Sequence, residues 1–250
     1  LKFLSDNYQP VINELFAKKS GVFGGRNGSM HLGSNNGIMP WTSAIVSSGI
    51  PVALGIAEAA KRKNLLDNKK RVVICQFGDG AMEEGVFIES INYASLKNLP
   101  IIFSCEDNGL AIHTTKSPRT GLSDYAQLSK TYGIKSFSGS FQDPRSLLQT
   151  FDDAYAYSRK ERLPSFIQIK CYRWIEHVGV SEDWNLGYRN KEELDPWLKV
   201  DVINNPVQFG ISLDFCIEKS KFYNNLFMNM FRDLQSESDP DREDLLTNVI

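Results

Sequence analysis

The sequence has 250 residues, of which 42% are hydrophobic and 23% are charged, and its formal net charge is -2 at pH 7. A chain of this length can bury the core of one large domain or of two small ones. The balanced charge gives no strong basic field and therefore argues against nucleic acid or an anionic membrane as a partner. No apolar run approaches the length of a membrane span and no signal peptide is recognised, so we expect neither membrane insertion nor secretion.

The first predicted elements are a helix over residues 1–20 and a second helix over residues 50–63, which has a face of small Ala and Gly residues. Between them lies the Gly-rich stretch 21–37. So many Gly and Asn residues predict a loop, and a loop of this length inside a domain is usually functional or disordered.

From residue 71 to residue 172, apolar runs of strand length alternate with amphipathic helical segments. Strands that are buried on both faces and separated by helices are typical of a parallel sheet. The pattern therefore predicts an α/β fold, with a doubly wound parallel sheet and flanking helices. The predicted strands are 71–77, 100–106 and 164–172, and the predicted helices are 82–98, 123–132 and 144–160.

The pattern changes beyond Asn204, where residues 211–235 predict an apolar-rich helix that is followed by an acidic tail. We therefore expect one domain over residues 1–203 and a helical C-terminal extension with the tail over residues 204–250. The helix serves either assembly with another chain or packing within the domain, and the sequence leaves both interpretations open.

Polar residues follow two of the predicted strands at their carboxyl ends. Asp79, in a Gly-Asp-Gly turn, follows strand 71–77, and Asn108 follows strand 100–106. Only one helix is predicted between these strands, so we expect parallel neighbours about 4.8 Å apart that place both side chains in one small volume. A carboxylate, an amide oxygen and a backbone carbonyl suit a Mg²⁺ ion that holds a diphosphate.

The residues around Asp79 fit a phosphate-binding turn. Gly78 and Gly80 would let the backbone turn sharply and approach the ligand closely. The helix that follows Ala81 would direct its free N–H groups at the phosphates. We therefore count Gly78, Gly80 and Ala81 among the candidate binding residues.

A purely structural role for Asp79 is the alternative. The carboxylate could cap the following helix, with Glu83 and Glu84 complementing the helix dipole. A Gly-Asp-Gly turn alone favours this simpler interpretation. The position of Asn108 changes the balance, because it lies 29 positions later (108 − 79), at the end of the next strand.

At these residues the sequence resembles a known family. Gly-Asp-Gly followed by 26 residues (81–106) and then an Asn pair is the thiamine-diphosphate signature, although Asp107 replaces the first Asn here. The stretches GGRNGSMHL, IPVALGIAEAAK and GYRNKEEL extend the similarity over roughly residues 1–203. They are similar to the alpha subunits of the two-chain 2-oxoacid dehydrogenases and of acetoin dehydrogenase. The resemblance implies the thiamine-diphosphate-binding fold, with a domain of the diphosphate-binding type.

The resemblance also implies which residues bind the cofactor. Asp79, Asn108 and the carbonyl of Leu110 would ligate Mg²⁺, and the backbones of Gly80 and Ala81 would bind the diphosphate of thiamine diphosphate.

The aminopyrimidine ring would contact a separate segment. The run 43–46 aligns with the segment that touches this ring, so the Ala44 carbonyl and the Val46 N–H are the candidate contacts. Ordinary packing at the start of a helix is the alternative for this run.

Two histidines have counterparts in the family. His177, in YRWIEH, matches an active-site histidine on a mobile loop and would orient or protonate the substrate-derived intermediate, since imidazole titrates near neutral pH. His31, in the GSMH loop, would help to order that loop near the cofactor. An exposed loop histidine more often has no role, and only the flanking residues favour one for His177. His113 is interpreted as a bystander.

The sequence departs from the family in three places. Asp107 stands for the first Asn of the pair, which is tolerable because the second supplies the ligand. Val178 follows His177 where mammalian mitochondrial relatives have a phosphorylatable Ser, so that form of control is not expected. The Tyr-Arg pair that grips the diphosphate in the family would fall just before Leu1.

The expected partner is a beta subunit. Activation of thiamine diphosphate needs a carboxylate at N1′ of its aminopyrimidine, and the acidic candidates here, Glu83 and Glu84, lie on the phosphate side of the site. The resemblance implies that a beta subunit supplies this glutamate in an alpha2/beta2 heterotetramer, with the cofactor at the interface. A lipoyl acyltransferase is a further implied partner. The expected location is a bacterial-type cytoplasm or an organelle matrix, where the four cysteines stay reduced.

Three functions stay open. The first is an oxidoreductase that decarboxylates a 2-oxo acid, or cleaves acetoin, and transfers the acyl or aldehyde unit to a lipoyl group or another acceptor. The second is a thiamine-diphosphate-dependent carboligase or aldehyde transferase with a specialised substrate, which the altered His177 loop motivates. The third is a non-catalytic assembly protein of the same fold. Retention of both metal ligands and of His177 favours an enzyme.

Overall fold

The computed structural model of the protein describes residues 7–34 and 38–246. These residues group into two compact units. One unit is Val46–Asn205, and the other comprises the described residues on both sides of that segment. Each unit has a hydrophobic core of its own. The domain boundary expected after residue 203 stays a prediction.

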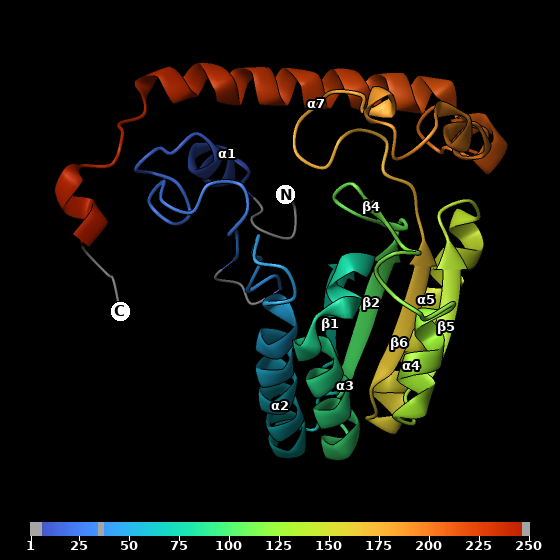
Figure 1. Ribbon diagram of the computed structural model, residues 1–250. Coiled ribbons are helices and arrows are strands. Elements are labelled where there is room, and N and C mark those ends of the chain that lie inside the picture. Colours follow the sequence, from blue (N-terminus) through green and yellow to red (C-terminus); the bar gives the residue numbers. More distant parts are fainter. Residues whose placement is uncertain (1–6, 35–37, 247–250) are drawn as a thin grey trace. The chain divides into compact units, whose positions relative to one another are not determined.

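A four-stranded parallel sheet forms the centre of the unit Val46–Asn205 (Figure 1). Its strands are adjacent in the order β1-β2-β6-β5, and each neighbouring pair is parallel. This arrangement confirms the predicted parallel sheet and the predicted adjacency of the first two strands. The strands are β1 (Val73–Gly78), β2 (Ile101–Asp107), β5 (Lys135–Ser140) and β6 (Ser165–Lys170).

Helices cover both faces of the sheet, as a doubly wound fold requires. On one face, the ring of Phe87 lies 6.1 Å from that of Phe103 and 6.4 Å from that of Phe166. On the other face, Leu147 packs against Ile167, the strand neighbour of Phe166. The first face is covered by α2 (Gly49–Asp67), α3 (Gly85–Lys97) and α4 (Tyr125–Thr131), and the second by α5 (Pro144–Glu161).

Local sequence signals begin two of these helices. The Asp124 carboxylate accepts a hydrogen bond from the backbone N–H of Ala126 at the start of α4, at 3.0 Å. The Asp143 carboxylate accepts one from Ser146 at the start of α5, at 3.1 Å, and Pro144 occupies the first turn. Both aspartates satisfy N–H groups that a helix leaves free at its beginning.

The sequence pattern does not predict β5. Its sequence, KSFSGS, contains Phe137 as its single large apolar residue, and the strand lies at the end of the strand order. A strand at the edge of a sheet needs fewer buried side chains than a central strand, so the apolar run on which the other predictions rest is missing.

The chain after β1 and β2 differs in detail from the predicted elements. A 3-10 helix, Asp79–Glu83, follows β1, and α3 begins only at Gly85 rather than at the predicted residue 82. A short hairpin follows β2. It consists of β3 (Leu110–Ala111) and β4 (Thr114–Thr115). Beyond β6 lie the 3-10 helices Trp184–Leu186 and Lys191–Leu194 and the short helix α6 (Asp195–Leu198).

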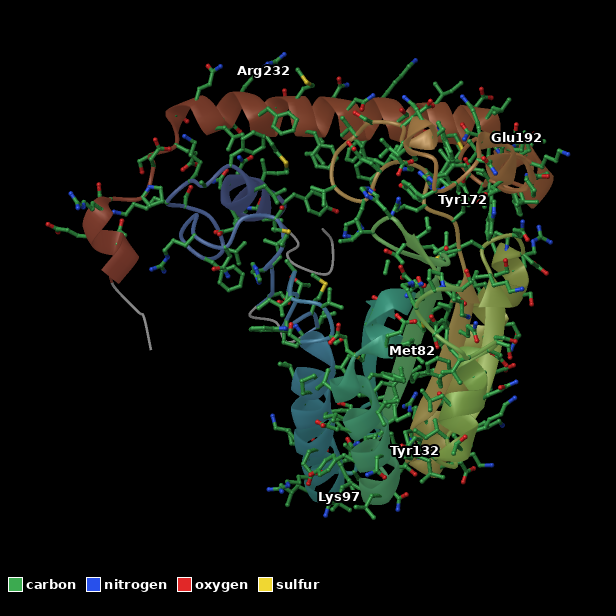
Figure 2. The ribbon with its side chains drawn as sticks, viewed as in Figure 1. Met82, Lys97, Tyr132, Tyr172, Glu192 and Arg232 are labelled. Carbon is green, nitrogen blue, oxygen red and sulfur yellow. The ribbon has the colours of Figure 1, made fainter. Side chains whose placement is uncertain are left out.

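The other unit joins segments from opposite ends of the sequence. In its core, Ile12 of α1 (Gln9–Leu15) is buried with Met230 of α7 (Leu213–Asp233). The Phe16 ring stands edge-on to that of Phe231, with centroids 5.6 Å apart. Figure 2 shows the side chains along α7 near the labelled Arg232. This unit also contains the 3-10 helices Pro206–Phe209, Leu234–Ser236 and Arg242–Leu246.

The acidic tail pairs with basic residues near the start of the sequence. Lys18 Nζ lies 2.7 Å from the Asp239 carboxylate, and Lys19 Nζ lies 2.6 Å from that of Asp241. Three short parts of predicted elements lie outside the described residues: 1–6, 35–37 and 247–250. None of the helices in the described ranges combines the length and the hydropathy that a membrane-spanning segment requires.

Candidate functional site

The ends of β1 and β2 bring the two predicted metal ligands together. Gly78, the last residue of β1, pairs with Glu106 of β2, so the strands end side by side. Asp79 follows Gly78 directly, and the backbone N–H of Asn108 interacts with the Asp79 carboxylate. The predicted convergence of these two residues is therefore confirmed, whereas their role as metal ligands stays a prediction.

The Asp79 carboxylate is buried and only partly paired. Its side chain is 0% exposed, and Oδ2 forms an ion pair with Arg119. The other oxygen, Oδ1, has no hydrogen-bond partner of normal geometry among the described residues. Burial raises the pKa of Asp79, although the Arg119 guanidinium opposes this shift. An unpaired buried carboxylate oxygen is costly in a folded protein, so this atom calls for a ligand.

The Gly-Asp-Gly turn uses its two glycines differently. A Cβ on Gly80 would lie 3.0 Å from the Cβ of Ala111, so the close approach of the two segments favours Gly there. A Cβ on Gly78 would meet no atom within 4 Å. Ala81 is buried, and its carbonyl accepts a hydrogen bond from Ser47 Oγ at 3.2 Å. Binding of a diphosphate by these backbones stays a prediction.

The loop after β2 orients Asn108. Its side-chain oxygen accepts a hydrogen bond from the Leu110 N–H at 2.9 Å, which closes a tight turn. Gly109, inside this turn, has a φ of +74° that favours glycine. The turn fixes the Asn108 side chain, and its amide oxygen retains a second lone pair for another partner.

Asp107, which stands for the first Asn of the family pair, has partners of its own. Its Oδ2 accepts a hydrogen bond from Gln168 Nε2 at 2.7 Å and lies 3.6 Å from Lys116 Nζ. A carboxylate is thus accommodated at this position by a neighbouring cation and an amide donor. The expectation that this exchange is tolerable agrees with these contacts.

Two residues of this region, Arg119 and Tyr125, carry no sequence signal. Arg119 pairs with Asp79 and also donates from Nη1 to Glu83 Oε2 at 2.5 Å. Tyr125 OH donates to Glu83 Oε1 at 2.6 Å. The sequence pattern places Glu83 beside a helix dipole but does not indicate Arg119 or Tyr125, because they lie 40 and 42 positions from their partners.

The segment before α2 holds two further candidates. Ala44 and Val46 are exposed in the bend that precedes the helix. Ser47, next to Val46, is buried with a φ of +64°, and its Oγ bond to the Ala81 carbonyl places Val46 near the turn after β1. Positive φ is unusual for Ser and is typical of functional segments. Contact of Ala44 and Val46 with a cofactor stays a prediction.

His177 lies on the exposed loop between β6 and the 3-10 helix at Trp184. Glu176 and Ser181 close this loop: the Glu176 N–H donates to the Ser181 carbonyl and the Ser181 N–H donates to Glu176 Oε1, both at 3.0 Å. Gly179, inside it, has a φ of +126°. The loop therefore presents His177 at an exposed tip, and the catalytic role stays a prediction.

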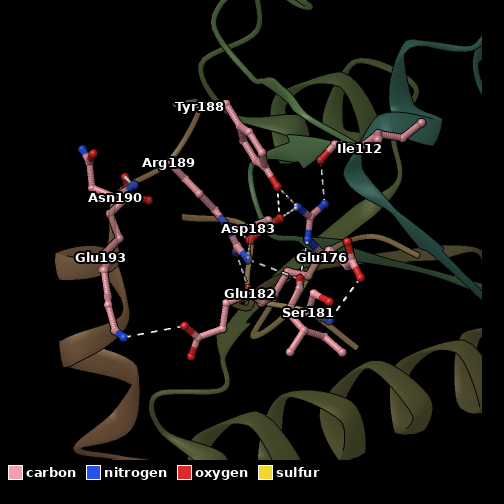
Figure 3. Close-up of polar contacts among 12 residues, drawn as sticks. Ile112, Glu176, Ser181, Glu182, Asp183, Tyr188, Arg189, Asn190 and Glu193 are labelled. Carbon is pink, nitrogen blue, oxygen red and sulfur yellow. Dashed lines mark hydrogen bonds and ion pairs between the residues drawn. The ribbon is translucent and has the colours of Figure 1, made fainter. Parts of the chain in front are cut away.

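An ionic network fixes the base of the His177 loop. Figure 3 shows Tyr188 and Arg189 directed toward Asp183. Arg189 Nε donates to Asp183 Oδ1 at 2.8 Å and Arg173 Nη2 donates to Oδ2 at 2.9 Å. Tyr188 OH donates to the same carboxylate. Burial opposes ionisation of Asp183, but Tyr188 and the two guanidinium groups together lower its pKa to about 2.

A cavity of about 370 Å³ connects the two parts of the site within this unit. It lies between the turn after β2 and the base of the His177 loop. A small organic molecule fits such a volume. Its lining includes Asn108, Leu110, Cys171, Arg173, Tyr188 and Trp197.

The other two histidines lie in different units. His31 is half-buried in the Gly-rich loop, where its carbonyl accepts a hydrogen bond from Asn27 Nδ2 at 2.9 Å. His113 packs its ring against Tyr188, with centroids 4.8 Å apart. The predicted role of His31 near a cofactor stays a prediction.

No cluster of three His, Cys, Asp or Glu side chains that could hold a metal ion occurs in the part of the chain that the structure describes. The predicted set of a carboxylate, an amide oxygen and a backbone carbonyl contains only one such side chain. It would therefore complete its coordination with oxygens from the bound ligand and from water.

Residues 4–209 match the model of the dehydrogenase E1 component family. The chain belongs to this family. Among curated proteins, the E1 component alpha subunit of pyruvate dehydrogenase from Porphyra purpurea is 31% identical over 78% of this chain and 57% of its own length. The mouse mitochondrial 2-oxoisovalerate dehydrogenase subunit alpha is 34% identical over 71% of this chain and 39% of its own length.

Another curated relative of this E1 family chain is named for a different substrate. The alpha subunit of acetoin:2,6-dichlorophenolindophenol oxidoreductase from Cupriavidus necator is 31% identical over 74% of this chain and 54% of its own length. A solved transketolase from Campylobacter jejuni aligns at 22% identity with a TM-score of 0.45, over 52% of this chain and 20% of that one. This E1 chain thus spans about half the length, or less, of these three curated relatives.

Proposed function

We propose that this E1 family chain is the cofactor-holding alpha subunit of a thiamine-diphosphate- and Mg²⁺-dependent dehydrogenase that acts on a small 2-oxo acid or on acetoin. Relatives named as alpha subunits of pyruvate, 2-oxoisovalerate and acetoin enzymes support this class of substrate. Location in a bacterial-type cytoplasm or an organelle matrix belongs to the same proposal, and the mitochondrial relative supports the latter.

The observation that carries the proposal is the free Oδ1 atom of Asp79. This atom is buried at the end of β1 and has no hydrogen bond of normal geometry among the described residues, with the backbone N–H of Asn108 beside the carboxylate. Carboxylate and amide oxygens are the ligands that Mg²⁺ prefers, and the ion normally completes an octahedron with phosphate oxygens and water. The residues present therefore fit a Mg²⁺ ion that holds a diphosphate.

The chain's own residues would divide the binding between them. Asp79, Asn108 and the Leu110 carbonyl would hold the ion, and the backbones of Gly80 and Ala81 would hydrogen-bond the diphosphate. Gly78 would shape the approach of the chain to it. When bound, thiamine diphosphate would supply a nucleophilic carbon for addition to a carbonyl group and an electron sink for cleavage of the adjacent C–C bond.

The remaining candidates would act on the organic part of the cofactor and on the substrate. The Ala44 carbonyl and the Val46 N–H would position the aminopyrimidine, and His31 would order the loop near it. His177 would orient the substrate or transfer a proton to it, since imidazole changes charge near neutral pH. Its exposed position at the loop tip suits a group that meets a substrate arriving from solvent.

A beta subunit would supply the glutamate at N1′ of the cofactor, in an alpha2/beta2 heterotetramer. The contacts of Glu83 support this, because Arg119 and Tyr125 both bind its carboxylate and hold it beside Asp79. A lipoyl acyltransferase would be the acceptor of the acyl unit if the substrate is a 2-oxo acid.

Calorimetry of the chain with its partner subunit tests the cofactor site. With Mg²⁺ present, the parent should bind thiamine diphosphate, and Asp79→Ala should lose most of this affinity because the buried ligand atom is gone. The control is Asp152→Ala, a change of the same residue type at an exposed position of α5. Equal Mg²⁺-dependent binding by Asp79→Ala and the parent would refute the metal assignment.

A second measurement tests the reaction. The parent complex should acylate a lipoyl domain from a 2-oxo acid, or cleave acetoin with reduction of an artificial acceptor. His177→Ala should lower turnover of the complex while the affinity for thiamine diphosphate changes little, since the cavity and the metal residues are intact. Unchanged turnover in His177→Ala would remove His177 from the mechanism.

A further inference from the structure

We propose that Arg119 is a positioning residue that leaves only one oxygen of Asp79 available to the metal and so favours Mg²⁺ over Ca²⁺. This inference rests on the proposed function. It concerns a residue that lies outside the Gly-Asp-Gly turn and outside the turn at Asn108, and that would act on the metal only through Asp79.

The guanidinium of Arg119 is held from several sides. It pairs with Oδ2 of Asp79, donates from Nη1 to Glu83 Oε2 at 2.5 Å and donates from Nε to the Thr115 carbonyl at 3.2 Å. The Arg119 side chain is 9% exposed and that of Asp79 is 0% exposed. A buried guanidinium with three different acceptors has a fixed position, because each contact constrains the planar group.

Glu83 is fixed in turn. Its Oε1 accepts a hydrogen bond from Tyr125 OH at 2.6 Å, and Lys116 Nζ lies 3.7 Å from the centroid of the Tyr125 ring. An ordered series of contacts therefore runs from the start of α4 through Glu83 and Arg119 to Asp79. Such supporting contacts orient a ligand atom in a metal site and tune its affinity.

The consequence for Asp79 is an unequal use of its two oxygens. Oδ2 is committed to Arg119, whereas Oδ1 is buried and has no hydrogen bond of normal geometry among the described groups. We therefore expect this carboxylate to offer a single oxygen to a metal ion. Mg²⁺ requires a near-ideal octahedron, whereas Ca²⁺ accepts six to eight oxygens and often takes both oxygens of one carboxylate.

The net charge of this cluster also favours binding of a divalent cation. Arg119 alone would neutralise Asp79, but it pairs with Glu83 as well, so the three side chains together keep one net negative charge. The cluster can therefore still attract a divalent cation while one carboxylate oxygen is occupied. The arrangement combines a fixed ligand geometry with a charge that suits a cation.

The test compares Mg²⁺ with Ca²⁺ as the ion that supports binding of thiamine diphosphate to the full chain with its partner subunit, measured by calorimetry. Arg119→Ala should lose about 10- to 100-fold in Mg²⁺-supported affinity. Its Ca²⁺-supported affinity should fall less, because both oxygens of Asp79 then become available. The decisive readout is the ratio of the Mg²⁺-supported affinity to the Ca²⁺-supported affinity for thiamine diphosphate. A general loss of stability would not lower this ratio.

Three further variants complete the test. Arg119→Lys, which retains a cation for Asp79, should recover part of the Mg²⁺ preference. Tyr125→Phe removes only the hydrogen bond to Glu83 and should shift the ratio in the same direction by a smaller amount, which covers the case that Arg119→Ala does not fold. Arg62→Ala changes an Arg whose side chain is 76% exposed on α2 and should behave as the parent does.

The outcomes separate the two proposals. A parent complex that binds no thiamine diphosphate with Mg²⁺ would refute the proposed function and this inference together. A parent that binds normally, with an unchanged ratio in both Arg119→Ala and Tyr125→Phe, would refute the role of Arg119 alone. Tighter Mg²⁺-supported binding by Arg119→Ala would show that the guanidinium competes with the metal, which also contradicts the inference.

Discussion

Two buried aspartates of the same unit have opposite chemical environments. Asp183 accepts hydrogen bonds from Arg173, Tyr188 and Arg189 on its two oxygens, and its pKa lies well below the ordinary value. Asp79 has one cationic partner and one unpaired oxygen, and burial raises its pKa. The first carboxylate is satisfied by the protein itself and holds a loop, whereas the second keeps one oxygen without a hydrogen bond of normal geometry.

Replacing Asp183 by Asn should loosen the base of the His177 loop. The folded-state pKa of Asp183 is lowered from 3.8 to about 2, so its contribution to stability is full above pH 4 and is lost as the pH falls toward 2. In the parent, the protection of residues 172–190 against hydrogen exchange, relative to the intrinsic exchange rate at each pH, should therefore fall over this pH range. Asp183→Asn should exchange rapidly at neutral pH already.

The control for this prediction is the neighbouring Glu182→Gln. The Glu182 side chain is 64% exposed and lies 3.7 Å from Lys191 Nζ, a surface pair of small energetic value. Its exchange profile should match that of the parent. If Asp183→Asn also matched the parent at pH 7, the network would not hold the loop.

At the scale of elements, a buried glutamate organises the Gly-rich loop. The Glu14 side chain, 0% exposed, accepts backbone N–H groups of Phe23 and Gly25 on Oε2 and of Asn27 on Oε1, at 2.7–2.9 Å. Asn27 in turn holds the carbonyl of His31. A loop with little regular structure thus acquires a defined course from one carboxylate at the end of α1.

Glu14→Gln should release this loop. The amide group of Gln carries its own N–H donors, so in either orientation it faces at least one of the three backbone donors that Glu14 now satisfies. The expected cost is about 1–3 kcal/mol for the buried donor left unpaired. Hydrogen exchange of residues 21–34 should accelerate.

Glu218→Gln provides the matched comparison in the same unit. Glu218 is an exposed residue of α7 whose carboxylate lies 3.9 Å from Lys219 Nζ. Its substitution should leave the exchange of residues 21–34 unchanged. An unchanged loop in Glu14→Gln as well would mean that the glycines, and not Glu14, fix its course.

The elements that the sequence predicts correctly are those with long apolar or amphipathic patterns. The strands that became β1, β2 and β6 and the helices that became α2, α3, α5 and α7 all have such patterns. β5 does not, because its serines and glycine suit an edge strand with little burial. The 3-10 helix before α3 was also missed, since short tight turns have no apolar period of their own.

The site shows the same limit at the scale of single contacts. The pairing of β1 with β2 was predictable from chain order, and with it the meeting of Asp79 and Asn108. Arg119 reaches Asp79 from 40 positions away, through a loop with no regular pattern. Such a contact depends on the path of the loop after β4, which residue spacing does not encode.

At the scale of the whole molecule, residues 7–34 and 213–244 share one core and a set of ion pairs, although a complete α/β unit lies between them in the sequence. Gln9 Nε2, for instance, donates to the Met230 carbonyl over a separation of 221 positions. Since this core contains Ile12, Met230 and Leu234 as its buried members, each contributes a large share of its stability.

Ile12→Ala should therefore loosen both ends of the sequence together. Removing a buried Ile side chain costs about 2–5 kcal/mol, and this small core has few other residues to compensate. Hydrogen exchange of α1 and of the C-terminal half of α7 should accelerate in parallel. Leu66→Ala, at a residue that is 87% exposed on α2, should change neither. Faster exchange in α1 alone would show that α7 is stable without the Ile12 side chain.

The sequence separation between Gln9 and Met230 also sets a delay between the synthesis of these two residues. A ribosome that adds ~5–20 residues per second needs on the order of 10–40 s to make the 221 positions between them. The apolar side of α1 leaves the ribosome first and stays without its partner during that interval, while the parallel sheet forms from the residues between. Newly made chains should therefore depend on a chaperone that shields α1 until α7 emerges.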